Sequence, residues 1–558
     1  MTGLILLLML TSAPLLEVWA KTTATIQNHW QGGFNGQLQL QIPQDMDTWK
    51  VHIIFDKPVE SLDVGEGTVT KFNDYEYILA GTKRAQSGSN MNVNLNGKLT
   101  GDDYPTSVCA YFDAAGTSYV QKDYKEALRL SLLFYYAQRS GKLPADNPIP
   151  WRNDSALTDC VVGGWYDAGD HVKFGFPMAG ALTMLLWGVE RFKDGYEAAG
   201  QLDKMYDTVK WGLDYLLDAW DPFTRELVIQ ASIPAEEVVK KYYWTSEALW
   251  FVHYNYVAQL FEVGDGDTDH QFWGRPEEMN MPRPCIKIGP GRPGSDVAGE
   301  TVAALAAGAI VFREKGDMDY AAELLEAAES LYTFAEDNRG RFSDNPPLMG
   351  NSWYYSSLDD RDEMCEAAAW LYKATGEEDY LVDAKNENEG RVPTELSWED
   401  KMASCHLLLY NLTGSQGLKR DVQNFLSSWQ PGANVAFSAL LAAEDGIDPE
   451  VNRKWAAEQI NYLLGDNPHD GGCFSYEIGY GSKYPLQPHH RAAPQTLYGG
   501  LVGGPDWYDR YNDTREDYVH NEVALDYNAG FQSALAGLVQ LRANNELPDT
   551  KNLCPCYQ

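Results

Sequence analysis

The hydrophobic pattern of this chain changes its period once, near residues 113–119, and that change limits what the chain can fold into. Before it, apolar and polar residues alternate in short runs separated by Gly and Asn, at residues 37–42, 49–55 and 91–95. Alternation over short runs is typical of half-buried strands. Residues 22–113 are therefore predicted to form an all-β sandwich domain.

After residue 119 the apolar residues recur at helical spacing in Ala- and Leu-rich segments. These are residues 124–139, 302–312, 320–335, 363–374, 455–464 and 530–541. No strands alternate with them, which argues against a parallel-sheet enzyme. Residues 119–545 are predicted to form an all-α domain of antiparallel helices around one core. Two long loops, residues 163–177 and 465–517, are where we expect the functional side chains.

The charge of the chain excludes several classes of partner. Its 558 residues include 80 acidic and 44 basic side chains, and the net charge of −36 repels phosphate backbones and anionic lipid. We therefore expect no nucleic-acid and no membrane partner. Aromatic residues make up 12% of the chain, and their flat apolar faces suit stacking on sugar rings. The composition favours a neutral polymer as partner, and we expect a monomer.

The first residues predict export from the cell. An apolar run at residues 4–10 is followed by Val18, Trp19 and Ala20 and then by polar sequence, which predicts a signal peptide of residues 1–20 and a secreted, extracellular protein. Eight cysteines are few for this length, so we expect disulfides that staple loops, with their pairing left open. No CxxC pairs or Cys/His clusters support structural zinc.

Two carboxylates stand three positions apart in the first long loop. Asp167 and Asp170 lie in a Gly-rich, non-helical segment. A pair of acids at this spacing can hold one water molecule, one accepting its proton while the other fixes its orientation. The alternatives are a solvated turn or a calcium loop.

A third acid, Glu522, lies in the second half of the chain. It stands between Tyr518 and Tyr527, just before the apolar helix expected at Ala529. A carboxyl among aromatic rings and near other acids should have a raised pKa, as a proton donor at neutral pH requires. The alternative is an acid that merely favours the helix dipole. His489 and Arg491 add cationic and hydrogen-bonding groups, for which substrate contact is favoured over metal binding.

Five strings of the chain resemble glycoside hydrolase family 9, the cellulase family. They are GWYDAGDHVKF at residues 164–174, VGDGDTDH at 263–270, PGSDVAGET at 293–301, PHHR at 488–491 and the segment 517–532. The resemblance, which spans residues 119–543, implies an (α/α)6 barrel that hydrolyses β-1,4-glucan with inversion. Asp170 matches the catalytic base, Asp167 its partner on the attacking water, and Glu522 the general acid.

The same resemblance assigns further roles. Substrate-binding positions are matched by His270, Trp273, His489, Arg491, Asp513 and Tyr527. The reaction requires no cofactor, and calcium as a structural ion is implied at Asp362 and Glu363. An inverting pair must leave room for water between carboxyls about 6.5 to 9.5 Å apart, which suits acids on two different loops.

The N-terminal sandwich resembles a family 2 carbohydrate-binding module. The string WQGGF at residues 30–34 and the strand that begins at Trp49 carry the resemblance. It implies that Trp30 stacks on cellulose. The other ring positions fall in residues 62–67 and 82–85, which contain no Trp, so this module is expected to bind weakly or to be structural.

The helical domain departs from its family along the substrate cleft. Ser357 and Thr394 stand where aromatic platforms are expected, a segment is missing before Ala433, and residues 221–251 look like an insertion. Each lost ring removes about 1 kcal/mol of stacking. Two hypotheses follow: a secreted endo-β-1,4-glucanase with intact acid and base, or a glucan-binding or structural relative with impaired turnover.

Overall fold

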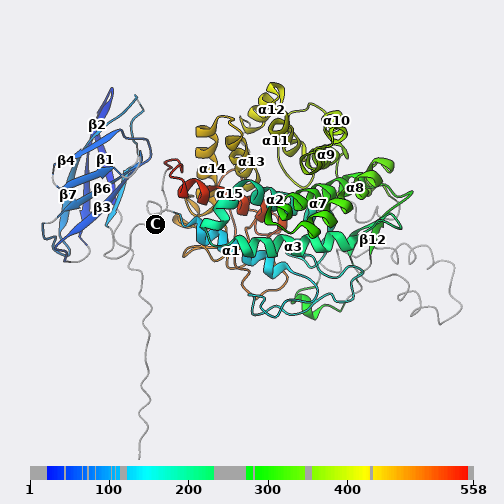
Figure 1. The fold of residues 1–558 in the computed structure, drawn as a ribbon. Helices are drawn as coiled ribbons and strands as arrows, with labels where there is room; N and C mark the ends of the chain where they lie inside the picture. Colours follow the sequence, from blue (N-terminus) through cyan, green and yellow to red (C-terminus); the bar gives the residue numbers. More distant parts are fainter. Residues whose placement is uncertain are drawn as a thin grey trace, which may run out of the picture. The chain divides into compact units, whose positions relative to one another are not determined.

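A computed structural model gives the fold of the chain (Figure 1). It describes residues 22–42, 45–65, 67–71, 74–81, 83–101, 103–106, 108–112, 122–231, 272–280, 283, 285–345, 355–427 and 432–550. The predicted signal peptide lies outside these residues. The chain divides into two compact units, one made of Met1–Gln121 with Asp549–Gln558 and one of Lys122–Pro548.

The first unit is the predicted sandwich. Its strands are β1 (Thr22–Trp30), β2 (Gly33–Gln41), β3 (Trp49–Phe55), β4 (Ser61–Val64), β5 (Thr68–Lys71), β6 (Glu76–Gly81), β7 (Asn90–Lys98) and β8 (Val108–Phe112). All pair antiparallel, in the order β4-β7-β2-β1-β8-β3-β6-β5, and β1 belongs to both sheets because it pairs with β2 and with β8. The alternating apolar residues of β2, β3 and β7 fill the space between the sheets.

One outer face of this sandwich is lined by amide side chains. Gln37 and Gln39 of β2 stand opposite Asn94 and Asn92 of β7, and the Gln39 amide donates a hydrogen bond to the Asn92 side chain at 3.0 Å. Trp30 is 54% exposed. The period-two pattern thus has a core side and a polar side, as the sequence predicts.

The second unit is helical. Twelve helices lie within its described residues: α1 (Tyr124–Gln138), α2 (Gly175–Ala198), α3 (Leu202–Ala219), α7 (Ser295–Lys315), α8 (Met318–Asp337), α9 (Arg361–Thr375), α10 (Glu378–Glu387), α11 (Met402–Thr413), α12 (Gln416–Ser427), α13 (Ala433–Glu444), α14 (Pro449–Leu463) and α15 (Leu525–Ala543). Helices α2, α7, α9, α11, α13 and α15 each pack on the next, and α15 packs back on α2. The other six lie outside this ring, which confirms the predicted (α/α)6 barrel.

The inner helices are apolar on nearly every side because neighbours surround them. Helix α7 is long and apolar enough to span a membrane, but 94% of its most apolar window is buried inside the unit. It packs closely on α9, since a Cβ added at Gly299 would come within 3.0 Å of the Glu363 backbone. The outer helix α1 is capped by Asp123, whose carboxylate accepts the Glu126 N–H at 3.1 Å.

A small sheet beside the barrel is absent from the sequence prediction. It consists of β9 (Lys173–Phe174), β10 (Trp220–Asp221), β11 (Glu226–Ala231) and β12 (Ile286–Ile288). The β10–β11 hairpin begins the predicted insertion, and residues 232–250 lie outside the described part. Strands β9, β10 and β12 have only two or three residues, too few for a period-two signal, and the six residues of β11 do not alternate between apolar and polar.

In the helical unit, two disulfides have both of their cysteines among the described residues. Cys160 is bonded to Cys285, and Cys365 of α9 to Cys405 of α11. The second bond joins two inner helices, whereas the first joins loop residues far apart in the sequence. The Cys160–Cys285 bond fits the expectation that disulfides staple loops. The Cys365–Cys405 bond departs from it, because both cysteines are buried in inner helices.

Candidate active site

The loop between α1 and α2 carries both acids of the predicted pair. The Asp167 N–H donates to the Val172 carbonyl at 2.9 Å, and the Val172 N–H to the Asp170 carboxylate at 3.2 Å. The Leu525 N–H at the start of α15 donates to the Asp167 carbonyl at 3.0 Å. These bonds make the segment a fixed turn against α15, with Asp167 and Asp170 only 2% and 6% exposed.

Asp167 is held in a strongly perturbed environment. Burial, followed by the nearby Asp170 carboxyl, raises the pKa of Asp167 well above its ordinary value, and Asp526 and Glu522 act in the same direction. The Tyr355 hydroxyl donates a hydrogen bond to Asp167 Oδ2 and opposes this rise. Two neighbouring acids with different environments are expected to take different roles.

Glu522 approaches this loop from a different part of the chain. Its segment pairs in parallel with His489, whose N–H donates to the Asn521 carbonyl at 2.8 Å. A Cβ added at Gly169 would lie 2.9 Å from Glu522 Oε1 and 2.2 Å from the His489 carbonyl. Only glycine therefore fits at residue 169, and this absence of a side chain brings the Glu522 carboxyl against the residue before Asp170.

His489 and Arg491 lie beside the Glu522 carboxyl. The Arg515 carbonyl accepts the His489 Nδ1 proton, and His489 Nε2 accepts a hydrogen bond from Arg491 Nη1 at 2.5 Å. This pattern requires the neutral imidazole with its proton on Nδ1. His489 Nε2 lies 4.0 Å from Glu522 Oε1. The Arg491 guanidinium lies 4.8 Å from the Trp273 ring.

The remaining predicted contact residues differ in their positions. Trp273 and Tyr527 are 48% and 36% exposed, and the Tyr527 pKa is raised by burial and by the charges of Asp526, Glu522 and Asp167. Tyr527 thus lies at the acids, whereas Trp273 lies beside His489 and Arg491. Asp513 instead accepts the backbone N–H groups of residues 486 and 487 at 2.7 and 2.9 Å, which holds the loop that leads to His489. His270 lies outside the described residues.

Sequence reasoning missed two residues of this site. Tyr355 stands 188 positions from Asp167, the carboxyl it contacts, and no local pattern marks it as functional. Asp526 is buried in the first turn of α15, where burial raises its pKa to about 6. The only sequence signal for Asp526 was its closeness to Glu522. The two acids are four residues apart, and α15 begins between them at Leu525.

At the predicted calcium position, Asp362 is engaged by protein groups, whereas Glu363 is fully buried and its carboxyl oxygens have no hydrogen-bond partner within the described residues. Asp362 accepts the Lys401 N–H at 2.6 Å, and the Arg391 guanidinium holds Asp400 through bonds of 2.6 and 2.8 Å. Arg391 also lies 3.8 Å from Asp362. Within the described residues no group of three or more His, Cys, Asp or Glu side chains is arranged to hold a metal ion. Asp362 and Glu363 as placed here do not fit a calcium ion, so we derive no step through one.

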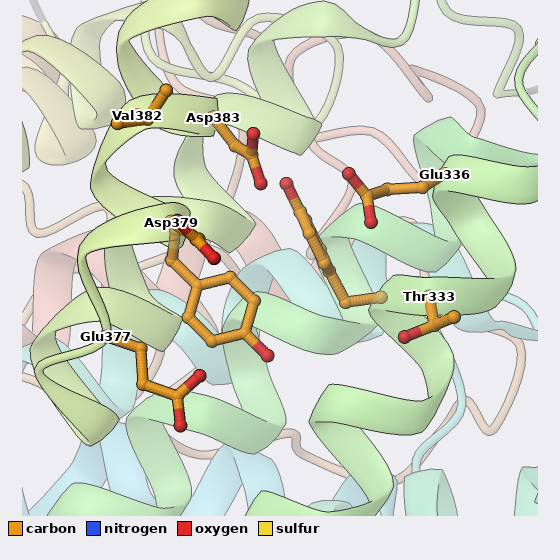
Figure 2. Close-up of a pocket in the computed structure, with 8 residues that line it drawn as sticks. Thr333, Glu336, Glu377, Asp379, Val382 and Asp383 are labelled. Atoms are coloured by element: carbon orange, nitrogen blue, oxygen red, sulfur yellow. The ribbon is translucent and has the colours of Figure 1, made fainter.

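A separate acid-lined cavity of about 440 Å³ lies between α8 and α10. Figure 2 shows the carboxyl groups of Glu336, Glu377, Asp379 and Asp383 around it. None of the predicted catalytic or binding residues lines this cavity. It is therefore distinct from the site formed by Asp167, Asp170 and Glu522.

The site has the composition of a carboxylate-based hydrolase: two acids on one loop, a third acid facing that loop, and exposed aromatic rings beside them. A model of glycosyl hydrolase family 9 matches residues 124–535. This chain belongs to glycosyl hydrolase family 9.

Relatives and solved structures agree with this membership. Endoglucanase B of Cellulomonas fimi is 40% identical in an alignment of 479 positions that covers 75% of this chain and 42% of that protein. The endoglucanase of the termite Nasutitermes takasagoensis superposes with a TM-score of 0.66 at 42% identity, over 76% of this chain and 100% of that one. Endoglucanase CelQ of Clostridium thermocellum, solved with cellotriose, gives a TM-score of 0.62 at 31% identity over 78% of this chain and 73% of that one.

Proposed function

We propose that this family 9 hydrolase is a secreted endo-β-1,4-glucanase that cleaves internal bonds of cellulose or related β-glucans with inversion. The observation that carries the proposal is the approach of Glu522 to the Asp167–Asp170 loop at Gly169. That approach puts a proton donor and a proton acceptor on separate elements of one site, as inverting hydrolysis requires.

In the proposed mechanism, Glu522 starts protonated and gives its proton to the glycosidic oxygen as the bond to the anomeric carbon breaks. A water molecule attacks that carbon from the opposite face and loses a proton to Asp170. Asp167, fixed by Tyr355, accepts the second hydrogen of this water and orients it. One displacement inverts the anomeric centre, and the mechanism uses no cofactor. Arg491 and Trp273 are proposed to contact the sugar beside Glu522.

The test is reducing-sugar release from carboxymethylcellulose by the full chain. Asp170→Asn and Glu522→Gln are each expected to lower kcat by a factor of roughly 10² to 10⁴, because each removes one general acid or base. Proton NMR early in a digest of the wild-type protein should show the α-anomer first. Activity equal in all three proteins would reject the assigned roles, and β-anomer as the first product would reject inversion.

A second candidate is a glucan-binding relative with impaired turnover. Ser357, at an expected platform position, is 1% exposed and donates its hydroxyl proton to Asp296 at 2.9 Å, so it offers nothing to a sugar ring. Native electrophoresis in gels that contain soluble β-glucan separates the two candidates. Retardation without hydrolysis favours the binder.

We propose that the N-terminal sandwich is a family 2-like carbohydrate-binding module with Trp30 as its stacking ring. The exposed Trp30 ring lies over Gly33, where an added Cβ would come within 2.9 Å of Trp30 Nε1. The cross-strand amides of β2 and β7 supply hydrogen-bonding groups for sugar hydroxyls on the same polar face. The disulfides Cys160–Cys285 and Cys365–Cys405 support the proposal of secretion, because such bonds persist in oxidising compartments.

A further inference from the structure

Two aromatic side chains are largely exposed to solvent on a turn that has no part in the proposed mechanism. Trp507 and Tyr508 are 76% and 78% exposed. Exposed aromatic rings side by side are uncommon on a soluble protein unless something stacks on them. The groups around these two rings indicate which kind of ligand stacks on them.

Both ends of this turn are tied to the segment that carries the general acid. The Gly503 N–H donates to the Glu522 carbonyl at 2.9 Å, and the Gly504 N–H to the His520 carbonyl at 2.8 Å. On the other side, the Tyr511 hydroxyl bonds the Asn521 side chain. Trp507 is three residues from Gly504, so its Cα lies at most about 11 Å from the Gly504 Cα. The rings therefore stand on the Glu522 side of the active site.

The turn presents its rings in one fixed arrangement. The Asp506 carboxylate accepts the N–H groups of Tyr508 and Arg510 at 2.9 and 3.0 Å, and the Arg510 Nε at 2.7 Å. The Arg510 hydrogen bond lowers the Asp506 pKa to about 2, so this pair stays ionised. The charges of Asp506 and Arg510 neutralise each other, and the Arg510 guanidinium lies 5.0 Å from the Tyr508 ring centroid. The Asp509 carboxylate in the same turn accepts a hydrogen bond from the Tyr462 hydroxyl. The two rings thus stand on a hydrogen-bonded support.

The chemistry of this surface favours a neutral sugar polymer. The net charge of −36 repels polyanions, whereas a sugar ring offers a C–H face that stacks on an indole or phenol. A further exposed ring belongs to the Glu522 segment itself: Tyr518 is 66% exposed, and its ring centroid lies 6.3 Å from that of His489. We propose that Trp507 and Tyr508 form an accessory stacking platform for the β-glucan chain at the Glu522 side of the cleft. This inference rests on the proposed function.

The experiment compares Trp507→Ala, Tyr508→Ala and the double variant with the full wild-type chain. In the Glu522→Gln background, affinity for neutral hydroxyethylcellulose is measured by gel retardation and should weaken about 3- to 10-fold for each ring lost. With Glu522 intact, KM for the polymer should rise by a similar factor while kcat stays within about two-fold. Trp507→Tyr keeps a stacking ring and should restore most of the affinity.

Phe223, which is 96% exposed in the β10–β11 turn, gives the matched control, since Phe223→Ala should change neither affinity nor KM. If Trp507→Ala and Tyr508→Ala show wild-type gel retardation and wild-type KM, the platform proposal is wrong and the hydrolase proposal is unaffected. The platform proposal is also wrong if Trp507→Tyr binds glucan as weakly as Trp507→Ala, because Trp507 would then act in loop structure. A wild-type chain that neither hydrolyses nor is retarded by glucan rejects the proposed function itself.

Discussion

At the scale of single residues, the site depends on small differences between similar carboxyl groups. Asp167 and Asp170 share one turn, and the Tyr355 hydroxyl donates a hydrogen bond to the Asp167 carboxylate. A hydrogen bond to a charged acceptor contributes about 1.5–3 kcal/mol. Tyr355 therefore helps to decide which acid orients the water and which takes its proton.

We predict that Tyr355→Phe lowers kcat by roughly 10- to 100-fold, as the loss of such a hydrogen bond implies. Because the Tyr355 bond lowers the Asp167 pKa, its removal should also move the acidic limb of the kcat/KM profile to higher pH. Steady-state rates between pH 4 and 9 check both effects. A variant with the wild-type profile and rate contradicts this role, and circular dichroism verifies that the fold is retained.

Glu477 shows what burial does to an acid outside the site. It is fully buried, and within the described residues neither carboxyl oxygen has a hydrogen-bond partner. Burial first, and then the Glu126 charge, raises its pKa well above the ordinary value. The folded state therefore holds a proton that the unfolded chain releases at lower pH, and stability falls as pH rises from about 4.5 toward the folded pKa.

We predict that Glu477→Gln removes this dependence. The free energy of unfolding of the variant should exceed that of wild type by an amount that grows with pH, by at most about 1.4 kcal/mol per unit. Urea unfolding at pH 5 and pH 8 measures the difference. Equal pH dependence in both proteins would show that Glu477 is not the titrating group.

At the scale of elements, the inner helices of the barrel enclose charges as well as apolar side chains. Glu300 of α7 and Glu363 and Glu366 of α9 surround Lys401, which stands just before α11. Burial alone would lower the Lys401 pKa, but these carboxyls together raise it. A Cβ added at Gly180 of α2 would lie 3.0 Å from Lys401 Nζ, so the helices meet closely at this cation.

The segment before α11 gives a prediction about calcium. Because Arg391 holds Asp400 and lies near Asp362, we predict that neither EDTA nor added calcium shifts the melting temperature of the full chain by more than about one degree. Arg391→Gln should lower it by a few degrees, since a bidentate, partly buried pair is lost. Lys287→Gln, which breaks an exposed pair with Glu226, is the control. A clear drop in wild-type stability with EDTA contradicts the prediction.

At the scale of the whole molecule, the chain consists of two compact units, to which different functions are assigned. The sandwich has its own core, formed by Phe34, Leu38, Val51 and Phe55 among others. The helical unit has a much larger one, and all the acids of the active site belong to it. Adhesion and hydrolysis are therefore expected to respond to different substitutions.

We predict that Trp30→Ala in the full chain weakens binding to insoluble cellulose by about 3- to 10-fold, the effect of one stacking ring. Its kcat/KM on a soluble glucan should stay at the wild-type value, because Trp30 belongs to the other unit. Pull-down isotherms and reducing-sugar assays measure the two effects. Lys71→Ala on β5 is the control, and a Trp30 variant that binds as well as wild type contradicts the proposed module.

Local repetition was enough to predict much of this fold. The period-two runs became β2, β3 and β7, and the Ala- and Leu-rich segments became helices such as α1 and α9, because hydrophobic spacing reports how each element faces its core. The same spacing did not reveal β9 to β12, because three of these strands have only two or three residues and the six residues of β11 do not alternate. The acids of the site stood out because their spacing and residue types carry chemistry even without a structure.

Other features arose from contacts between distant segments. Tyr355 on Asp167, the fit of Glu522 against Gly169, and Arg391 beside Asp362 each join residues whose separation along the chain no periodicity encodes. These contacts form because the six inner helices close into a ring. The closed ring fixes the positions of the loops that join the helices, and so brings these residues together. Residue patterns thus specify the elements and the chemical groups, whereas packing of the whole barrel selects which of those groups come within bonding distance.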